Sequence, residues 1–238
     1  MENPIIVAVE LSGCVIANGM PGAGKSTVAT LGARLLPRAA GAKGDDVNQM
    51  ILSGRVWFAG EPPEEAARQV EVCHRNMCSL AANFVDFGSA VLMDTVVADR
   101  AELDFLLTLL APRPVRLVTL APGPAVCRQR NGTRARDERW DFDGYDRLDA
   151  DMRRDFGDVG WWFDTSALTP TETAERVVRE TVRFPLLSVG SPQNPQCEPR
   201  ALRQDCGEGP MAPRVLGGGR LAGPYEPFHP VRTDVPVG

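Results

Sequence analysis

Histidine and lysine are scarce in this chain: its 238 residues hold two histidines, and only two of its 26 basic residues are lysines. The six cysteines include no C-x-x-C pair, so the two histidines beside them make no zinc-like cluster. Lysine and arginine form no dense block, and the net charge of −5 has the wrong sign for a nucleic-acid footprint. We therefore expect no zinc site and no nucleic-acid partner.

Long apolar runs and a secretion signal are also lacking. No apolar run approaches the ~20 residues of a membrane span, and the start at Met1–Pro4 has an acidic residue and a proline, unlike a signal peptide. We expect no membrane partner and a cytoplasmic location, where ATP is available. Cys73 and Cys78 lie on one expected helix, where burial as small apolar residues is favoured over redox chemistry.

The chain does contain a complete phosphate-binding motif, because residues 19–26 fit G-x-x-x-x-G-K-[ST] without a mismatch. An apolar run at 15–17 precedes the motif, and apolar residues at helical spacing follow it until Pro37, so the order is strand, loop, helix. Glycines let consecutive N–H groups point into one concavity, to which the helix start adds its positive dipole end. The residues predicted to bind a nucleotide are Gly19, Met20, Pro21, Gly22, Ala23, Gly24, Lys25, Ser26 and Thr27.

Lys25 and Ser26 have distinct expected roles in this loop. Lys25 would lie on the β- and γ-phosphates, and the Ser26 hydroxyl would complete the ligand shell of Mg²⁺. In a chain that otherwise uses arginine, a lysine at this position suggests that a compact ammonium is needed there. We thus predict ATP and Mg²⁺ as the bound nucleotide and metal; the alternative is a glycine-rich turn that binds nothing.

The rest of the chain to residue 184 alternates between strand and helix patterns, which predicts an α/β fold with a parallel sheet covered by helices. Its ligands should gather at the carboxyl ends of the strands. A second strand is expected to end near Gly44, with further strands at 91–94, 115–120 and 161–164. Expected helices cover 47–52, 60–88, 101–110, 122–130, 145–156 and 171–184.

Within the expected helix before Gly88, apolar residues recur at alternating steps of four and three and are predicted to face the core: Ala66, Val70, Cys73, Met77, Leu80 and Phe84. The final 51 residues, 188–238, contain 8 glycines and 9 prolines without any helical or alternating period. This composition favours a disordered tail over a docking segment. We therefore assign residues 1–187 to one domain and 188–238 to the tail.

The loop motif, the element Gly44-Asp45-Asp46 and the arginine-rich segment 128–139 together resemble small P-loop kinases. These include gluconate, shikimate and adenylylsulfate kinases and the chloramphenicol phosphotransferase and tunicamycin-resistance type of protein. The resemblance covers about residues 13–184. It implies a P-loop NTPase fold with a five-stranded parallel sheet in the order 2-3-1-4-5, a mobile arginine-bearing lid, and transfer of a phosphoryl group from ATP to an alcohol.

Carried over by position, the resemblance makes Asp45 the candidate general base, with Asp46 as the fallback. A carboxylate there would orient the attacking hydroxyl and take its proton. The alternative is that either aspartate only caps the helix expected near Val47. Asp94 ends an apolar strand as a Walker-B-type acid would, holding Mg²⁺ through water or orienting Ser26; helix capping again competes.

Five arginines fall within twelve residues, and there are two interpretations of them: the implied lid or a solvated helix face. Gly132 breaks the helix and favours a hinged lid. The preferred catalytic pair is Arg130 and Arg134, and the other members are Arg128, Arg136 and Arg139. Trp57 and Phe58 lie near the acceptor side of this architecture, either as a wall for a ring-containing substrate or as packing residues.

The acceptor itself is predicted from a shortage of basic residues. Between Asp45 and Gly88 the chain offers only Arg55, Arg68, His74 and Arg75, which disfavours a strongly anionic acceptor and favours a neutral or cationic hydroxyl compound. An antibiotic inactivated by its producer is one candidate. The rival from another class is an ATPase or nucleotide-dependent switch that acts through a protein partner, and a nucleic-acid end kinase is a third. The sequence leaves a homodimer open.

Overall fold

The computed structural model describes residues 11–58, 60–135, 139 and 142–189. From residue 190 onward the predicted tail lies outside the described residues, as do positions 136–138 of the arginine-rich segment. Among the helices that the structure describes, none is both long and apolar enough to cross a membrane.

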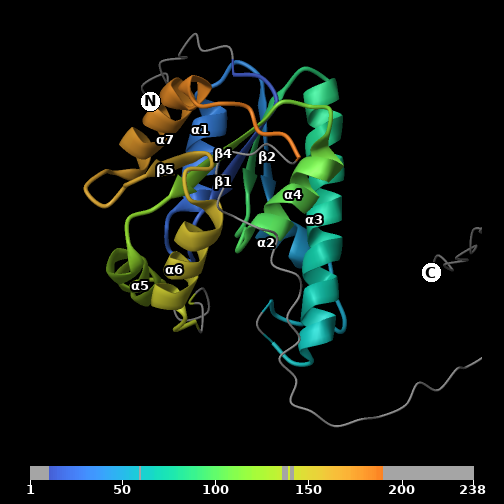
Figure 1. Cartoon of the computed structure of the whole chain (residues 1–238), viewed down its shortest axis with the longest axis vertical. Helices are drawn as coiled ribbons and strands as arrows, with labels where there is room; N and C mark the ends of the chain where they lie inside the picture. The colour runs from blue at the N-terminus through green and yellow to red at the C-terminus, as the bar shows by residue number, and fades with distance from the viewer. Residues whose placement is uncertain (1–10, 59, 136–138, 140–141, 190–238) are drawn as a thin grey trace, which may run out of the picture. The chain divides into compact units, whose positions relative to one another are not determined.

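Five parallel strands form one sheet in the order β2-β3-β1-β4-β5, which confirms the predicted order (Figure 1). The strands are β1 (Cys14–Asn18), β2 (Ala39–Lys43), β3 (Ala90–Asp94), β4 (Val115–Leu120) and β5 (Trp161–Phe163). The weak pattern of β2, Ala-Ala-Gly-Ala-Lys, forms a strand because each of its five residues pairs with β3.

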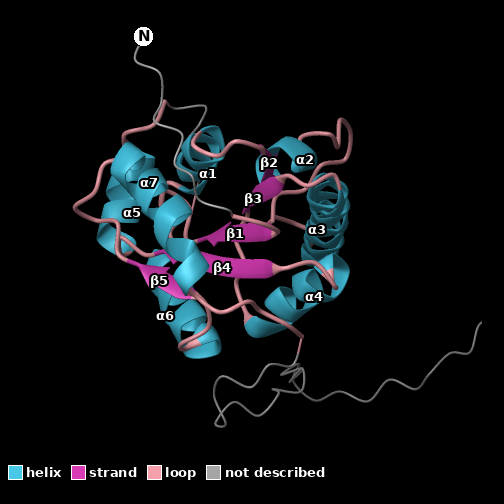
Figure 2. Cartoon of the chain, turned by 90° about the horizontal axis from the view of Figure 1, so that it is seen from above, coloured by secondary structure: helices cyan, strands magenta, loops and turns pink. Residues whose placement is uncertain are grey.

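Helices cover both faces of the sheet, with α1 and α7 on one side and α3 and α4 on the other (Figure 2). Their bounds are α1 (Lys25–Arg34), α2 (Gly44–Asn48), α3 (Pro63–Asp86), α4 (Arg100–Leu110), α5 (Pro124–Gly132), α6 (Tyr145–Phe156) and α7 (Pro170–Glu180), followed by the 3-10 turn η1 (Thr181–Arg183). Local sequence signals explain where several of these helices begin. Thr169 and Glu172 form a capping box at α7, and Pro63 occupies the first turn of α3.

Strand residues alternate between two cores. Ile16 and Leu117 pack with the side chains of α3 and α4, while Val15 and Val118 pack with those of α1 and α7. All four side chains are buried, and burial of a large aliphatic side chain contributes about 1.5–3 kcal/mol. Because both faces are covered, the strands are mostly apolar, as in β1 and β3.

Two predictions of detail are wrong. Leu80 and Phe84 do not face the core, because their exposed fractions are 41% and 42%; Ala81 takes the buried position instead. The short helix predicted at 47–52 is α2, which begins at Gly44 and ends at Asn48. Its N-cap is Lys43, so Asp45 and Asp46 lie in the first helical turn and neither is the cap.

Candidate active site

The carboxyl edge of the sheet brings three parts of the predicted site side by side. Asp94, the last residue of β3, pairs with Ala17 of β1 on one side and with Lys43 of β2 on the other. The chain continues from β1 into the loop 19–26 and from β2 directly into Asp45. Asp94 therefore lies between the phosphate-binding loop and the candidate base, as strand order 2-3-1 requires.

The loop 19–26 has the backbone of an anion cradle. Gly22 adopts φ of +83°, and a Cβ there would lie 2.4 Å from the carbonyl oxygen of Cys127 on α5, so only glycine fits. Gly24 is the N-cap of α1 and adopts φ of +97°. A Cβ there would have only the Nη1 of Arg130 nearby, at 4.0 Å. The loop can thus approach phosphate oxygens with its backbone, and the residues present fit a nucleotide.

Lys25 folds back over this loop. Its Nζ donates to the carbonyl oxygens of Gly19 at 2.8 Å and Met20 at 3.1 Å. Burial lowers the pKa of Lys25, and the carboxylates of Asp94 and Asp45 oppose that shift. The ammonium therefore lies close to both acids, at the loop that would hold the phosphates.

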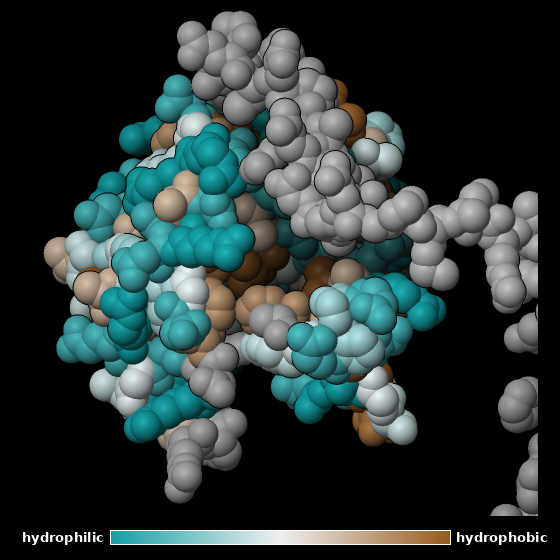
Figure 3. Space-filling model, turned by 60° about the horizontal axis from the view of Figure 1, so that its bottom comes forward, coloured by the Kyte–Doolittle hydropathy of each residue, from teal (hydrophilic) through white to brown (hydrophobic). Residues whose placement is uncertain are grey.

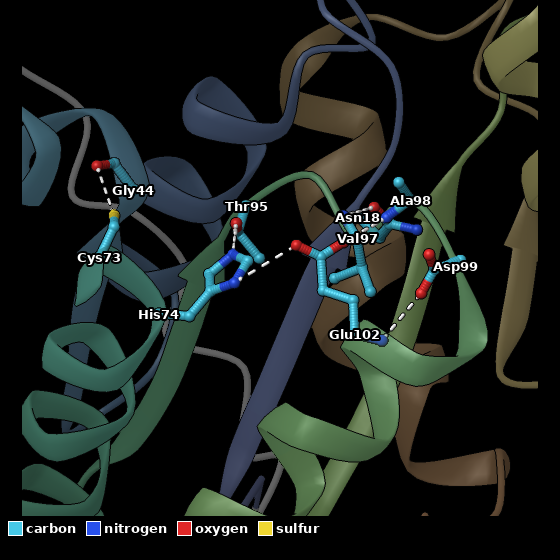
Figure 4. Close-up of polar contacts among 9 residues, drawn as sticks. All are labelled: Asn18, Gly44, Cys73, His74, Thr95, Val97, Ala98, Asp99 and Glu102. Atoms are coloured by element: carbon cyan, nitrogen blue, oxygen red, sulfur yellow. Dashed lines mark hydrogen bonds and ion pairs between the residues drawn. The ribbon is translucent and has the colours of Figure 1, made fainter. Parts of the chain in front are cut away.

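Asp45 faces the cleft from the first turn of α2, whereas Asp46 is not among the described residues that line the cavity. Removal from bulk water and the nearby Asp94 raise the pKa of Asp45, while Lys25 lowers it. The Sγ of Cys73 donates to the carbonyl oxygen of Gly44 at 3.4 Å and so fastens the start of α2 to α3 (Figure 4). A carboxylate with a raised pKa, held by a packed helix, is a better proton acceptor than an ordinary aspartate.

Asp94 is 5% exposed and is the last residue of its strand, five residues before the N-cap of α4. The cap of α4 is Asp99, whose carboxylate accepts from the backbone N–H of Glu102 at 2.8 Å. Capping is therefore not the role of Asp94. Together with the Ser26 hydroxyl, which also lines the cavity, it offers the oxygen ligands that Mg²⁺ prefers.

Lys25, Ser26, Asp45 and Asp94 line the same cavity of about 680 Å³, which is large enough for the phosphates of a nucleotide and a small molecule. Figure 3 shows a hollow with apolar residues inside it and a mostly hydrophilic rim on this side of the molecule. The cavity extends from the phosphate-binding loop to an apolar and aromatic wall made by Trp57, Phe58, Val70, Val96, Phe142 and Leu148. Trp57 and Phe58 thus line the cavity, and they also contact each other in it.

The aromatic wall joins segments that are far apart in sequence. The rings of Trp57 and Phe58 lie 4.9 Å apart, Phe58 lies 6.1 Å from Phe142, and Phe142 contacts Tyr145 edge-on at 4.9 Å. These spacings are in the range of favourable aromatic contacts. The wall therefore connects the loop before α3 to the start of α6.

The predicted arginines take different positions. Arg134 lines the cavity, and it is close enough to Lys25 and Asp45 to influence the pKa of both. Arg130 donates to the carbonyl oxygens of Ala23 at 3.4 Å and Thr165 at 3.2 Å, so it ties α5 to the phosphate-binding loop and to the segment after β5. Arg128 pairs with Asp146 at 2.7 Å and is not among the described residues that line the cavity.

Of the two remaining arginines in the segment 128–139, one lies among the described residues. Arg139 donates to the carbonyl oxygen of Arg134 at 2.8 Å, and Arg136 lies outside the described residues. Helix α5 ends at Gly132, where the sequence predicts a break. A lid made of this segment therefore stays a prediction.

A buried polar network at the cavity floor was not predicted (Figure 4). His74 of α3 is 4% exposed; its Nε2 lies 3.0 Å from the Thr95 hydroxyl and its Nδ1 lies 3.3 Å from a carboxylate oxygen of Glu102. The other oxygen of Glu102 accepts from the backbone N–H of Ala98 at 2.7 Å. Burial lowers the pKa of His74 to about 4 and raises that of Glu102 to about 7.

Asn18 connects this floor to the phosphate-binding loop. Its side chain is fully buried at the end of β1, and its Oδ1 accepts from the backbone N–H of Val97 at 2.8 Å (Figure 4). Its Nδ2 lies 3.4 Å from the Thr119 hydroxyl of β4. The only sequence signal for this role is a polar residue at the end of a buried strand, which the loop motif does not require.

Comparison with known proteins agrees with this fold. A family model described as an AAA domain matches residues 14–157. No curated protein sequence matches the chain. Solved structures of similar fold include the tunicamycin resistance protein of Deinococcus radiodurans, which is 22% identical with a TM-score of 0.53, over 74% of this chain and 98% of that one.

A sugar kinase from Janibacter sp. HTCC2649 is 17% identical with a TM-score of 0.52, over 70% of this chain and 92% of that one. The APS kinase of Mycobacterium tuberculosis, in complex with AMPPNP and APS, is 18% identical with a TM-score of 0.50, over 73% of this chain and 99% of that one. At these identities the likeness shows the fold alone. The fold is that of a P-loop NTPase, with small-molecule kinases among its structural neighbours.

Proposed function

The chain belongs to the AAA domain family, and we propose that it is an ATP-dependent phosphotransferase that acts on a hydroxyl group of a small molecule. One observation carries the proposal. The phosphate-binding loop and Asp45 line the same cavity, which continues beyond them into an apolar space with its own aromatic wall. A hydrolase would need room only for water beside the phosphates, whereas a kinase needs a second substrate site.

In the proposed reaction the acceptor oxygen forms a bond to the γ-phosphorus of ATP. The bond from that phosphorus to the β–γ bridging oxygen breaks, and ADP leaves with the electron pair. Asp45 orients the acceptor hydroxyl and takes its proton. Its raised pKa supports this role, because a base works best when its pKa approaches the working pH.

Lys25 and Arg134 would neutralise the phosphate oxygens as charge shifts toward the leaving group. Ser26 and Asp94 would hold Mg²⁺, whose chemistry when bound is to neutralise charge on the β- and γ-phosphate oxygens. Arg130 would support the loop by its contacts to Ala23 and Thr165. We further propose that the segment around Arg134 closes over the phosphates as a lid.

The identity of the acceptor calls for a screen. Acceptor-stimulated ADP release should be measured across hydroxylated antibiotics, nucleosides and sugars, with the product checked by mass spectrometry. The tunicamycin resistance protein among the structural neighbours supports the inclusion of antibiotics, and resistance of a producer is our proposal for the biological role. We expect at least one hydroxyl compound to stimulate ADP release. Its product should be heavier than the acceptor by about 80 Da, the mass added by one phosphoryl group.

Slow ATP hydrolysis that no acceptor stimulates would contradict the kinase and favour a switch that acts through a protein partner. The homodimer and the cytoplasmic location also stay predictions, and light scattering on the purified protein tests the first of them.

A further inference from the structure

Helix α2 turns a second polar side chain toward the cavity beside the candidate base. Asn48 lies three residues after Asp45 on this helix, so the two side chains share one of its faces, one turn apart. Both residues line the cavity. Asn48 is half-buried, and its amide has no hydrogen-bond partner among the residues that the structure describes. This amide can therefore offer an oxygen acceptor and two N–H donors to a ligand.

The end of strand β3 brings a hydroxyl to the same side of the sheet. Val91 and Met93 pack with the side chains of α3 and α4. Since side chains alternate along a strand, Thr95 is expected on that same side and Asp94 on the side of α1. The Thr95 hydroxyl indeed lies 3.0 Å from the Nε2 of His74 on α3 (Figure 4). Consecutive residues thus serve different parts of the cavity, with Asp94 toward the phosphate-binding loop.

The Thr95 hydroxyl lies close to the start of α2 and keeps spare hydrogen-bonding capacity. A Cβ on Gly44, the residue before Asp45, would lie 3.7 Å from its oxygen. The hydroxyl has one donor and two acceptor sites, and its one hydrogen-bond partner among the described residues is His74. Because Thr95 lines the cavity, the remaining sites can bind a ligand.

The charge around these two groups favours a neutral ligand. Lys25 and Arg134 act on the phosphates in the proposed function. The other described arginine of the lining, Arg147, is 90% exposed and lies 3.6 Å from Asp151 of its own helix. A carboxylate on the acceptor would thus lose water without gaining a buried cation. Lys25 and Arg134 are close enough to Asp45 to lower its pKa, so an ammonium bound beside Asp45 would meet two like charges.

The lining next to Thr95 is apolar. Val96 follows it in the chain, and Val70 lies one helical turn before its partner His74 on α3. Both valines line the cavity and are half-buried. A hydrocarbon group packed there gains free energy by leaving water. The acceptor should therefore combine a polar end beside α2 with an apolar body.

We infer that the acceptor is a neutral diol with an apolar body: one hydroxyl meets Asp45, and the neighbouring hydroxyl is bound by Asn48 and Thr95. This inference names the substrate class of the active site and rests on the proposed function. Side chains one helical turn apart have Cβ atoms about 5–6 Å apart, so Asp45 and Asn48 can reach adjacent hydroxyls of one molecule. Asn48 and Thr95 would then determine which acceptors are phosphorylated.

Five six-carbon probes test the inference. Hexane-1,2-diol carries both hydroxyls, and hexan-1-ol and hexan-2-ol each lack one of them. The compounds 2-hydroxyhexanoate and 1-aminohexan-2-ol carry a carboxylate or an ammonium in place of the terminal hydroxyl. Binding of each probe to the full chain is followed by shifts of the protein's NMR signals, with AMPPNP and Mg²⁺ present. Transfer of labelled γ-phosphoryl from ATP to each probe is measured separately.

Hexane-1,2-diol should bind on the order of 10-fold tighter than either mono-alcohol, because Asn48 and Thr95 bond to its second hydroxyl. The hydroxy acid and the amino alcohol should bind more weakly than the diol. Asn48→Ala and Thr95→Val should each remove most of the preference for the diol while the affinities for the mono-alcohols and for Mg·AMPPNP stay unchanged. Thr95→Ser keeps the hydroxyl and should keep the preference.

Asn76→Ala and Thr108→Val are the matched controls. Asn76 is exposed on α3, and Thr108 is exposed on α4, where its hydroxyl donates to the carbonyl oxygen of Asp104. Neither is among the described lining residues, so both variants should bind the probes as the wild type does. Asn48→Arg should raise the affinity for 2-hydroxyhexanoate on the order of 10-fold, a gain that a purely structural role of Asn48 would not produce.

Equal or tighter binding of a mono-alcohol, the hydroxy acid or the amino alcohol by the wild type would overturn the inference, whether or not the variants fold. Absence of NMR shifts with the diol at about 100 mM would overturn it as well. So would a folded Asn48→Arg protein without any gain for the hydroxy acid. A diol preference in binding without transfer to the diol supports the diol site and contradicts the proposed kinase. Transfer to the probes without a diol preference contradicts the diol site and leaves the kinase standing.

Discussion

At the scale of single residues, the site combines a local motif with contacts that no local pattern reveals. Lys25 could be predicted because the loop motif fixes its neighbours within eight positions. The pairing of His74 with Thr95 spans 21 residues, and both side chains lie in separate elements. Such a contact depends on how α3 packs against the end of β3, so the sequence offered only a basic residue on an expected helix.

Lys25→Ala should abolish phosphoryl transfer while the fold stays intact. The lysine acts as a point charge on phosphates, and its hydrogen bonds are to loop carbonyls and not to the core. Turnover is measured beside circular dichroism and thermal unfolding. The matched control is Lys43→Ala, because the chain's other lysine ends β2 and is not among the described lining residues. Near-normal turnover in a folded Lys25→Ala protein would contradict the assignment of the loop.

The His74–Glu102 pair predicts a stability difference that depends on pH. In the folded state the pKa of His74 falls from 6.5 to about 4, so this group costs stability as pH decreases through that interval. The pKa of Glu102 rises from 4.5 to about 7, so this group adds stability as pH decreases through its own interval. Between pH 4.5 and 6.5 the two contributions oppose each other.

The substitution Glu102→Gln removes the contribution of Glu102 and keeps that of His74. The free energy of unfolding of the variant, relative to wild type, should therefore fall as pH is lowered from about 7 toward 4.5, by roughly 3 kcal/mol. Urea unfolding at several pH values measures it. Parallel pH curves for the two proteins would show that the pair does not hold its proton as described.

At the scale of elements, the sheet was predictable and helix faces were less so. Strand order follows from resemblance and from buried apolar runs, but the predicted stripe on α3 used a seven-residue repeat. A straight α-helix drifts by about 20° per seven residues against that repeat. Over the 24 residues of α3 the drift moves Phe84 off the sheet and brings Ala81 onto it. The early start of α2 at Gly44 was not predicted because its first turn consists of a glycine and two polar residues, Asp45 and Asp46, which show no apolar period.

Catalysis should depend on Arg134, which follows α5, and not on Arg128, which lies within that helix. Arg134 lines the cavity beside Lys25, whereas Arg128 pairs with Asp146 and lies over the Tyr145 ring. Arg134→Ala should lower the rate of transfer on the order of 10²-fold, the scale of a lost charge-stabilising group. Arg128→Ala should change it little. Comparable losses in both variants would favour a general structural role of the segment over a lid.

At the scale of the whole molecule, the domain is expected to be complete near residue 188. Leu187 forms an antiparallel bridge to Val115, and Phe184 stacks on Trp161 with ring centroids 4.8 Å apart. A chain that ends after Ser188 keeps both contacts and should retain its melting temperature and its activity. A chain that ends at Arg183 loses both, so it should be less stable. Loss of folding or of acceptor binding on truncation after Ser188 would show that residues after 188 are needed for stability or for the site.

The whole cavity could be predicted in outline, since strand ends of a parallel sheet gather at one edge. The lining of its far end could not, because the aromatic wall combines Trp57 and Phe58 with Phe142, which lies more than eighty positions later in the chain. Only the packing of the loop before α3 against the start of α6 brings them together.

The central claim is that Asp45 activates an acceptor within the cavity that holds Mg·ATP. It is tested most directly by transfer of labelled γ-phosphoryl to an acceptor in Asp45→Asn and in Asp94→Asn, with nucleotide affinity measured with and without Mg²⁺. Asp45→Asn should bind Mg·ATP almost normally while transfer falls by ~10² or more. Asp94→Asn should instead weaken the Mg²⁺-dependent part of nucleotide binding. Full transfer by Asp45→Asn would contradict the assignment of the base and direct attention to Asp46.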